Sequence, residues 1–173
     1  IHLYNSPSAN EIVGNRVINC GGSGIVIPTS NNTLVYRNLL SGNNGDGIDA
    51  YRVLGVIISG NIFLNNALTG IGIYSQSYAV IIIDNYIYGS GFNGIHISAF
   101  EETAMFPPKN IIIAGNIVRN CNNSGIRTYG GEDILIIGNT AINNGQGATG
   151  EAGIKITDGS FGTKVFDAVR IHI

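Results

Sequence analysis

The feature that most constrains this chain is a repeat of about 23 residues built around asparagine. In its idealised form the repeat has an apolar triplet, usually followed by Gly, before the Asn and an apolar-x-apolar segment after it, and single positions are polar in some repeats, such as Arg16 and Ser41. The separations are 23, 23, 24, 31 and 23 residues, and the six residues are Asn15, Asn38, Asn61, Asn85, Asn116 and Asn139. A Gly-Ile pair comes nine residues after each of the first five Asn and fourteen after the sixth. Short, alternating runs rich in Ile and Val indicate strands joined by turns, and not a helical repeat. The sequence therefore predicts an all-β chain, a right-handed single-stranded parallel β-helix of six to seven rungs.

Stacking of the rungs predicts which side chains point inward. The apolar residues three before and two after each Asn are expected to stack on like neighbours roughly 4.8 Å apart. The Asn residues are expected to form an interior ladder of amide hydrogen bonds. Cys20 and Cys121 fall in one column four rungs apart, about 19 Å, which is beyond disulfide reach.

Charge and composition exclude several classes of partner. The chain has 173 residues, of which only 12% are charged, and its formal net charge is −2, so no basic field for nucleic acid is expected. Gly or Asn interrupts every apolar run within a few residues, so no membrane span is expected.

The two ends favour an incomplete solenoid. Residues 1–173 form one expected domain, but Ile1-His2-Leu3-Tyr4 matches a Gly-Ile strand that lacks its Gly. Neither end shows a polar capping helix, and open terminal rungs invite edge-to-edge pairing. We expect either a piece of a longer chain or a chain that associates end to end.

The residues that follow each Gly-Ile pair form two outward columns with chemical character. The first column is His2, Val26, Asp49, Gly72, His96, Arg127 and Lys155, and the second is Tyr4, Pro28, Tyr51, Tyr74, Ser98, Tyr129 and Thr157. Tyr rings offer flat faces to sugars, and Arg or Lys neutralises uronate carboxylates. This face therefore predicts a groove for an acidic polysaccharide, whereas the alternative is an ordinary solvated strand face.

Two insertions interrupt the regular spacing next to this face. Residues 100–108 include Glu101 and Glu102 and follow one strand of the face, and residues 145–152 precede another. Long loops on a regular solenoid commonly carry function, so these two are expected to flank the groove, although drift at a tolerant turn would also produce them.

The middle of the chain resembles a known family. The repeat exemplified by residues 24–33 resembles the pectate-lyase-like superfamily. Residues 101–111 and 125–134 resemble an acidic, Pro-containing loop and one rung of bacterial mannuronan C5-epimerases and related alginate lyases. Those epimerases carry Asp-Pro-His on this face, whereas the nearest segment here, Ser23 to Pro28, has neither the acid nor the His. The resemblance implies polysaccharide chemistry but leaves that standard site missing from this stretch.

We expect other residues of the outward columns to supply the groups that uronate elimination or epimerisation needs. These reactions need carboxylate neutralisation, a base and an acid. We assign Arg127 to the first role, His96 to the base, and Tyr74 or Tyr129 to the acid. Substrate-binding roles are expected for Asp49, Tyr51, Lys155, Glu101 and Glu102.

Other chemistries fit the sequence less well. Asp49 has no stacked acidic neighbour in its column, so neither a Ca²⁺ site nor any other metal or cofactor is expected. A hydrolase needs clustered carboxylates, which the outward columns lack. The sequence thus favours an extracellular β-helix protein that binds or modifies an acidic polysaccharide, as a lyase or epimerase if it is an enzyme. The alternatives are a non-catalytic structural, fibre-forming or adhesive β-helix and a surface spike that only grips polysaccharide.

Overall fold

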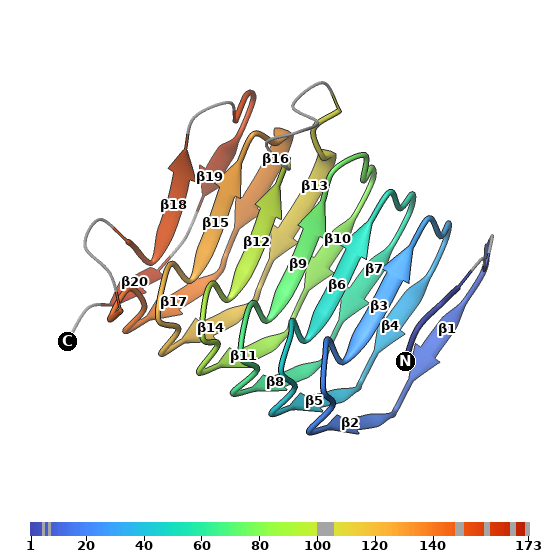
Figure 1. Cartoon of the computed structure of the whole chain (residues 1–173). Helices are drawn as coiled ribbons and strands as arrows, with labels where there is room; N and C mark the ends of the chain where they lie inside the picture. The colour runs from blue at the N-terminus through green and yellow to red at the C-terminus, as the bar shows by residue number, and fades with distance from the viewer. Residues whose placement is uncertain are drawn as a thin grey trace.

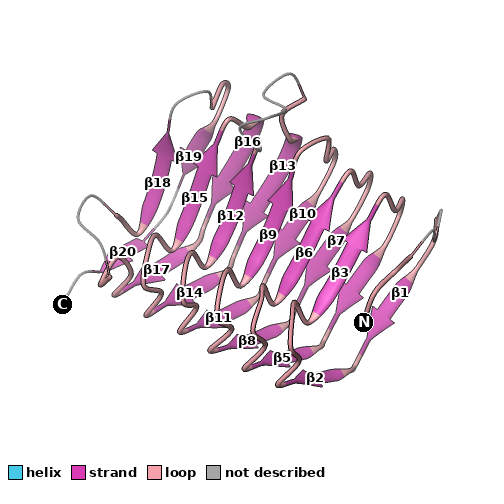
Figure 2. Ribbon diagram, in the orientation of Figure 1, coloured by secondary structure: helices cyan, strands magenta, loops and turns pink. Residues whose placement is uncertain are grey.

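The chain winds through three parallel sheets in turn, as Figure 1 shows. This computed structural model describes residues 1–4, 6, 8–99, 106–147, 151–157, 160–166 and 169–171. Within those ranges every regular element is a strand (Figure 2). Paired strands are three apart in chain order, because each rung contributes one strand to each sheet. The predicted right-handed parallel β-helix is confirmed.

Sheet 1 consists of the strands that begin at the Ile of each Gly-Ile pair. They are β3 (Ile25–Pro28), β6 (Ile48–Tyr51), β9 (Ile71–Tyr74), β12 (Ile95–Ser98), β15 (Ile126–Tyr129) and β18 (Ile154–Thr157). The start of the chain continues this sheet, since His2 forms a parallel bridge with Val26.

Sheets 2 and 3 contain the strands on either side of the Asn turn. Sheet 2 holds β1 (Glu11–Val13), β4 (Leu34–Tyr36), β7 (Ile57–Ser59), β10 (Ile81–Ile83), β13 (Lys109–Ala114), β16 (Glu132–Ile137) and β19 (Lys164–Phe166). Sheet 3 holds β2 (Arg16–Ile18), β5 (Leu39–Ser41), β8 (Ile62–Leu64), β11 (Tyr86–Tyr88), β14 (Ile117–Arg119), β17 (Thr140–Ile142) and β20 (Val169–Ile171).

The core follows the predicted inward columns. One column is Ile12, Val35, Ile58, Ile82, Ile113 and Ile136, and the other is Val17, Leu40, Phe63, Ile87, Val118 and Ala141; all are buried. Parallel pairing keeps like residues in register, for example Ile58 beside Ile82. Each fully buried aliphatic side chain contributes roughly 1.5–3 kcal/mol relative to an exposed one. The hydrophobic stack is therefore continuous along the solenoid.

The predicted Asn ladder is confirmed from Asn15, its half-buried end, to Asn139. Asn61 is typical: its Nδ2 donates to Oδ1 of Asn85 at 3.0 Å and to the carbonyl of Val35 at 2.9 Å. Its backbone N–H donates to the same Oδ1 at 3.0 Å. Because Asn61 is only 1% exposed, these bonds satisfy polar groups that no water reaches.

Glycine recurs at two positions of the repeat, and a different physical constraint favours it at each. The residue before the ladder Asn adopts a left-handed conformation, with φ +60° at Gly60, which favours Gly. Gly47, in a Gly-Ile pair, has no such requirement. A Cβ there would lie 2.5 Å from the carbonyl oxygen of Gly70 in the next rung, so close stacking excludes a side chain.

A second, shorter ladder was not predicted from the sequence. Asn43 donates through Nδ2 to Oδ1 of Asn66 at 2.9 Å, at the turn between sheets 3 and 1. Cys20 lies in this column, where its backbone N–H donates to Oδ1 of Asn43. Cys20 and Cys121 are free thiols, as predicted. In the described part of the chain, no helix is long and apolar enough to span a bilayer.

Candidate functional site

The outward face of sheet 1 has the predicted register. Asp49, Gly72, His96, Arg127 and Lys155 are paired in sequence across β6, β9, β12, β15 and β18. The second column is likewise in register, and it runs Pro28, Tyr51, Tyr74, Ser98, Tyr129 and Thr157. The expectation that all of these positions face solvent was wrong for Gly72, Pro28 and Ser98, which are buried.

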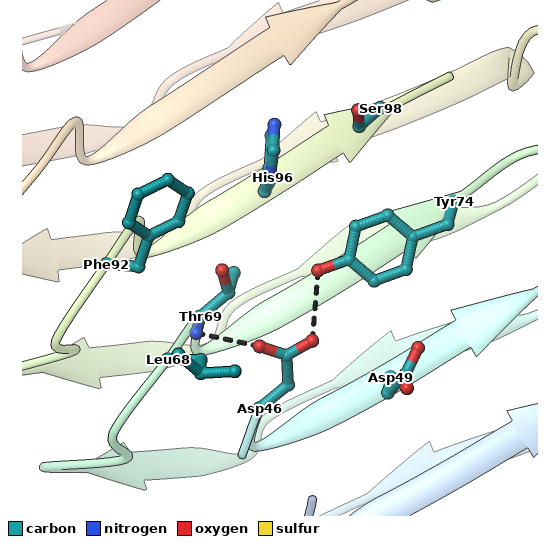
Figure 3. Close-up of a pocket in the computed structure, with 8 residues that line it drawn as sticks. All are labelled: Asp46, Asp49, Leu68, Thr69, Tyr74, Phe92, His96 and Ser98. Carbon is teal, nitrogen blue, oxygen red and sulfur yellow. Dashed lines mark hydrogen bonds between the residues drawn. The ribbon is translucent and has the colours of Figure 1, made fainter. Parts of the chain in front are cut away.

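A cavity of about 430 Å³ opens on this face. Its walls come from three successive rungs, and the lining residues are Asp46, Asp49, Leu68, Thr69, Tyr74, Phe92, His96 and Ser98 (Figure 3). The structure therefore brings together three predicted site residues, Asp49, Tyr74 and His96. The remaining predicted residues lie on neighbouring strands or outside the described residues.

Asp46 is the most buried carboxyl group of the cavity, at 6% exposure. It occupies the turn just before β6. The backbone N–H of Thr69 donates to its Oδ1 at 2.8 Å, and the hydroxyl of Tyr74 donates to its Oδ2 at 2.9 Å (Figure 3). Burial raises the pKa of Asp46, and these two hydrogen bonds oppose the rise because they stabilise the carboxylate.

Tyr74 reaches Asp46 because Gly72 has no side chain. A Cβ on Gly72 would lie 2.5 Å from the Tyr74 hydroxyl, so the Tyr ring covers the glycine. Burial, followed by the charge of Asp46, raises the pKa of Tyr74. Tyr74 is consequently a protonated phenol at neutral pH, directed into the cavity.

Asp49 lies beside this pair on β6. Burial is the main cause that raises the pKa of Asp49 to about 6, and repulsion from the charge of Asp46 adds to it. The charge of His2 acts in the opposite direction. Two carboxyl groups thus share the N-terminal half of the cavity, and Asp49 titrates near neutrality.

His96 lies between two aromatic rings. Its ring centroid is 6.1 Å from those of Tyr74 and Phe92, both in edge-to-face arrangements. Burial, followed by the charge of Arg127, lowers the pKa of His96 to about 4, although Glu151 acts in the opposite direction. The imidazole is therefore neutral at pH 7. Its Nε2 is buried and has no hydrogen-bond partner among the described residues.

Arg127 supplies the positive charge next to His96. It is the register partner of His96 on β15, and its Cζ lies 6.0 Å from the ring centroid of Tyr129. Its Nε is buried and, like His96 Nε2, makes no hydrogen bond within the described ranges. Two buried polar atoms on adjacent strands thus lack a hydrogen-bond partner among the described residues, an arrangement that costs free energy unless a ligand satisfies them.

Lys155, on the next strand, is already engaged. Its Nζ lies 2.8 Å from Oε1 of Glu151, and the other carboxylate oxygen of Glu151 accepts a bond from Ser124. Burial raises the pKa of Glu151, but bonds and charges from Lys155, Ser124 and Arg127 outweigh it and lower the pKa overall. A direct substrate contact by Lys155 would require breaking this ion pair.

The other predicted residues stand further from the cavity. Tyr51 pairs with Tyr74, and Tyr129 pairs with Ser98, but neither lines it. Glu101 and Glu102 lie outside the described residues, as do residues 100–105 and 148–150 of the two insertions. Among the residues that are described, no group of three or more His, Cys, Asp or Glu side chains is arranged to hold a metal ion.

Sequence reasoning missed Asp46 and Thr69, and it placed Gly72 in the first outward column without its role in seating Tyr74. A signal for Asp46 was present, because a polar residue precedes the Gly of almost every Gly-Ile pair. This turn column is Ser23, Asp46, Thr69, Asn93 and Ser124. Its members bond from rung to rung, as when the N–H of Asp46 donates to Ser23 Oγ. Asp46 is the one whose carboxylate also faces the cavity.

Comparison with known proteins fixes the family. The model of the right-handed β-helix region matches residues 1–167. The chain belongs to this family. No curated protein matches the chain.

Several solved structures resemble the chain in fold. A double mutant of the periplasmic alginate epimerase AlgG has a TM-score of 0.80 at 21% identity, over 96% of this chain and 36% of that one. An endo-xylogalacturonan hydrolase from Aspergillus tubingensis has a TM-score of 0.66 at 12% identity, over 95% of this chain and 59% of that one. The Dettilon tailspike protein has a TM-score of 0.64 at 18% identity, over 87% of this chain and 42% of that one. The chain spans less than two thirds of each.

Proposed function

We propose that the face of sheet 1 binds an acidic polysaccharide outside the cell and that its cavity transfers protons on a bound uronate, as a lyase or C5-epimerase does. The observation that carries the proposal is the pairing of a neutral His96, whose Nε2 is unpartnered among the described residues, with Arg127 on the next strand. A base beside a fixed cation is what removal of a proton next to a carboxylate requires.

Each residue has a role in this chemistry. Arg127 binds the uronate carboxylate and stabilises the charge that develops on it when C5 loses its proton. His96 accepts that proton. In β-elimination the C5 electron pair then forms a double bond to C4, the C4–O bond breaks, and the Tyr74 hydroxyl protonates the departing oxygen. In epimerisation Tyr74 instead returns a proton to the opposite face of C5.

Asp46 orients Tyr74 in this proposal. The hydrogen bond at 2.9 Å fixes the phenol over Gly72, and the raised pKa of Tyr74 keeps it protonated until it acts. The names of the similar solved structures, an alginate epimerase and a xylogalacturonan hydrolase among them, support a polysaccharide as the ligand. The periplasmic epimerase supports a location outside the cytoplasm.

A hydrolase is the second candidate, favoured by one observation that the sequence did not reveal. Asp46 and Asp49 line the same cavity, and the pKa of Asp49 is raised to about 6. A carboxyl group that titrates near neutrality beside a second carboxyl group is the arrangement that glycosidases use. Here Asp49 would be the general acid.

One experiment separates these reactions. The protein is incubated with alginate and with pectate, while unsaturated uronate absorbance, reducing ends and the proton NMR spectrum are followed. A lyase raises both absorbance and reducing ends, a hydrolase raises reducing ends alone, and an epimerase changes only the NMR spectrum. His96→Gln should abolish lyase or epimerase activity, whereas the matched control Tyr86→Phe, on sheet 3, should retain full activity.

Binding is tested separately by calorimetric titration. Arg127→Ala should weaken binding of an oligouronate by roughly 1.5–3 kcal/mol, the scale of a lost charge-assisted hydrogen bond. A neutral oligosaccharide of equal length should be unaffected. Binding without turnover would leave a polysaccharide-gripping scaffold, and no uronate binding would favour a structural, fibre-forming or adhesive β-helix.

A further inference from the structure

The two outward columns of sheet 2 carry charged side chains only at the ends of the first, in contrast to sheet 1, although Lys109 pairs with Glu132 beside them and the guanidinium of Arg37 lies over the Tyr36 ring. Its first column is Glu11, Leu34, Ile57, Ile81, Ile112, Leu135 and Lys164, and its second is Val13, Tyr36, Ser59, Ile83, Ala114, Ile137 and Phe166. Ile57, Ile112, Val13 and Phe166 are between 38% and 51% exposed. Large apolar side chains that are exposed side by side on one sheet face are candidates for an interaction surface.

The first column is symmetric about its centre. Two Leu flank three Ile, and the charges at the two ends are opposite, with Glu11 at one end and Lys164 at the other. Neither Glu11 nor Lys164 forms an ion pair within the described part of the chain. Reversing the direction of the column therefore reproduces its apolar order and exchanges its charges.

We propose that two copies of this chain pack through sheet 2 about a two-fold axis that runs along β10. Such an axis reverses the solenoid direction but preserves the strand direction, so the first column of one copy faces the first column of the other. Ile81 meets Ile81 of the partner subunit, and Glu11 meets Lys164 of the partner subunit. A two-fold interface requires this kind of self-complementary patch.

Surface shape agrees with this arrangement. A hollow of about 660 Å³ lies at the C-terminal end of the face, and Leu135, Lys164 and Phe166 are among its lining residues. The two-fold axis places β1 of the partner subunit, with its exposed Val13, over this hollow. Sheet 2 lies behind sheet 1 in Figure 1, so the polysaccharide face of each copy stays open.

The extent of the face sets the expected affinity. Seven strands about 4.8 Å apart span about 29 Å, and their residues rise about 3.3 Å each, so the strands cover roughly 300 Å² in projection. Flanking turns enlarge this area, but it stays below the roughly 800 Å² per partner of a standard stable interface. The dimer should therefore be weak, with a dissociation constant in the micromolar range.

Sedimentation velocity over about 5 to about 500 µM protein tests the proposal, since this range brackets a micromolar constant. The wild-type chain should pass from monomer to dimer. Ile81→Lys places two like charges together on the axis and should weaken the dimer at least about 100-fold. Ile117→Lys, a matched change at an exposed position of sheet 3, should leave it unchanged.

A charge exchange tests the orientation and remains informative if Ile81→Lys fails to fold. Glu11→Lys should weaken the dimer about 10-fold, because the two-fold axis creates two repulsive pairs. Adding Lys164→Glu should restore the wild-type affinity within a few-fold. A folded wild type that stays monomeric throughout, association that Ile81→Lys does not affect (as in end-to-end stacking), or failure of the exchange to restore affinity would each overturn the proposal.

Discussion

The hydroxyl of Tyr74 donates to Oδ2 of Asp46 at 2.9 Å, and this bond joins two successive rungs of the solenoid. It opposes the rise in the pKa of Asp46 that burial causes, because it stabilises the carboxylate. Tyr74→Phe removes the donor, so the pKa of Asp46 should rise further. NMR titration of the Asp46 carboxyl group measures the change. Tyr129→Phe, in the same column but outside the cavity, is the control, and an unchanged Asp46 titration in Tyr74→Phe would disprove the coupling.

Gly72→Ala should raise the pKa of Asp46 as Tyr74→Phe does, although it substitutes neither Tyr74 nor Asp46. A Cβ on Gly72 would lie 2.5 Å from the Tyr74 hydroxyl, and the Tyr side chain can rotate away. The φ of Gly72 is not in the left-handed region, so the backbone adds no strain, and the free energy of unfolding should fall by about 1.5–3 kcal/mol, the scale of the lost bond to the Asp46 carboxylate. The matched control is Gly22→Ala, where a Cβ meets nothing within 4 Å. An Asp46 titration that moves equally in both variants would argue against the role of Gly72.

The sequence predicted this site only in part, for a physical reason. A period of about 23 residues determines which side chains share a column, so Asp49, His96 and Arg127 were placed correctly on one face. The period does not determine the conformation of each side chain, and so it does not determine the direction in which the side chain points. Tyr74 leans over Gly72 toward an earlier rung, and Asp46 points from a turn into the cavity, so neither contact follows from register.

The fold was more predictable than the site because it repeats. The Asn ladder and the Ile columns each recur in successive rungs, and one correct register places all of them. Lys155 shows the opposite case. Its pairing with Glu151 depends on an insertion that occurs in a single rung, so no other rung provides a pattern from which to predict it.

The stability of the protein should depend on pH through His96. Its pKa is about 4 in the folded protein and 6.5 as a free side chain, so the unfolded state binds the proton more tightly. The contribution of His96 to the free energy of unfolding is therefore fully present above pH 6.5. As the pH falls toward 4, this contribution disappears, and the free energy of unfolding decreases by about 2–4 kcal/mol. His96→Gln should lack this loss. Chemical denaturation at pH 7.5 and pH 4.5 compares the two proteins, and equal pH dependence would show that His96 is not held neutral by burial.

Ile58→Ala and Ile57→Ala test the assignment of inside and outside on one strand. Ile58 is 0% exposed and Ile57 is 39% exposed. Removing the inward side chain leaves a cavity between rigid rungs and should cost ~2–5 kcal/mol, whereas the outward change should cost less than about 1 kcal/mol. Urea denaturation at low protein concentration, where the chain is monomeric, gives both values. Similar losses for the two variants would mean that the inward column has been misassigned.

The centre of the Asn ladder should be intolerant of a carboxylate. Asn85 donates through Nδ2 to Oδ1 of Asn116 and to the carbonyls of Ile58 and Ile83, while its own Oδ1 accepts from Asn61. Asn85→Asp keeps the shape but replaces the donor with a second acceptor, so a buried charge faces three oxygens. The free energy of unfolding should fall by at least about 3 kcal/mol at pH 7.

The pH dependence of the Asn85→Asp variant tests whether the buried charge causes its loss of stability. Burial should raise the pKa of the introduced carboxyl group above its unfolded value, so the folded variant binds a proton more tightly than the unfolded one. The loss should therefore shrink as the pH falls from 7 toward 4, because the neutral acid regains a donor. Asn15→Asp is the control at the ladder's half-buried end, and it should cost only about 1 kcal/mol because solvent reaches the charge. A loss for Asn85→Asp that does not change with pH would indicate that the shape of the turn matters, and not its donors.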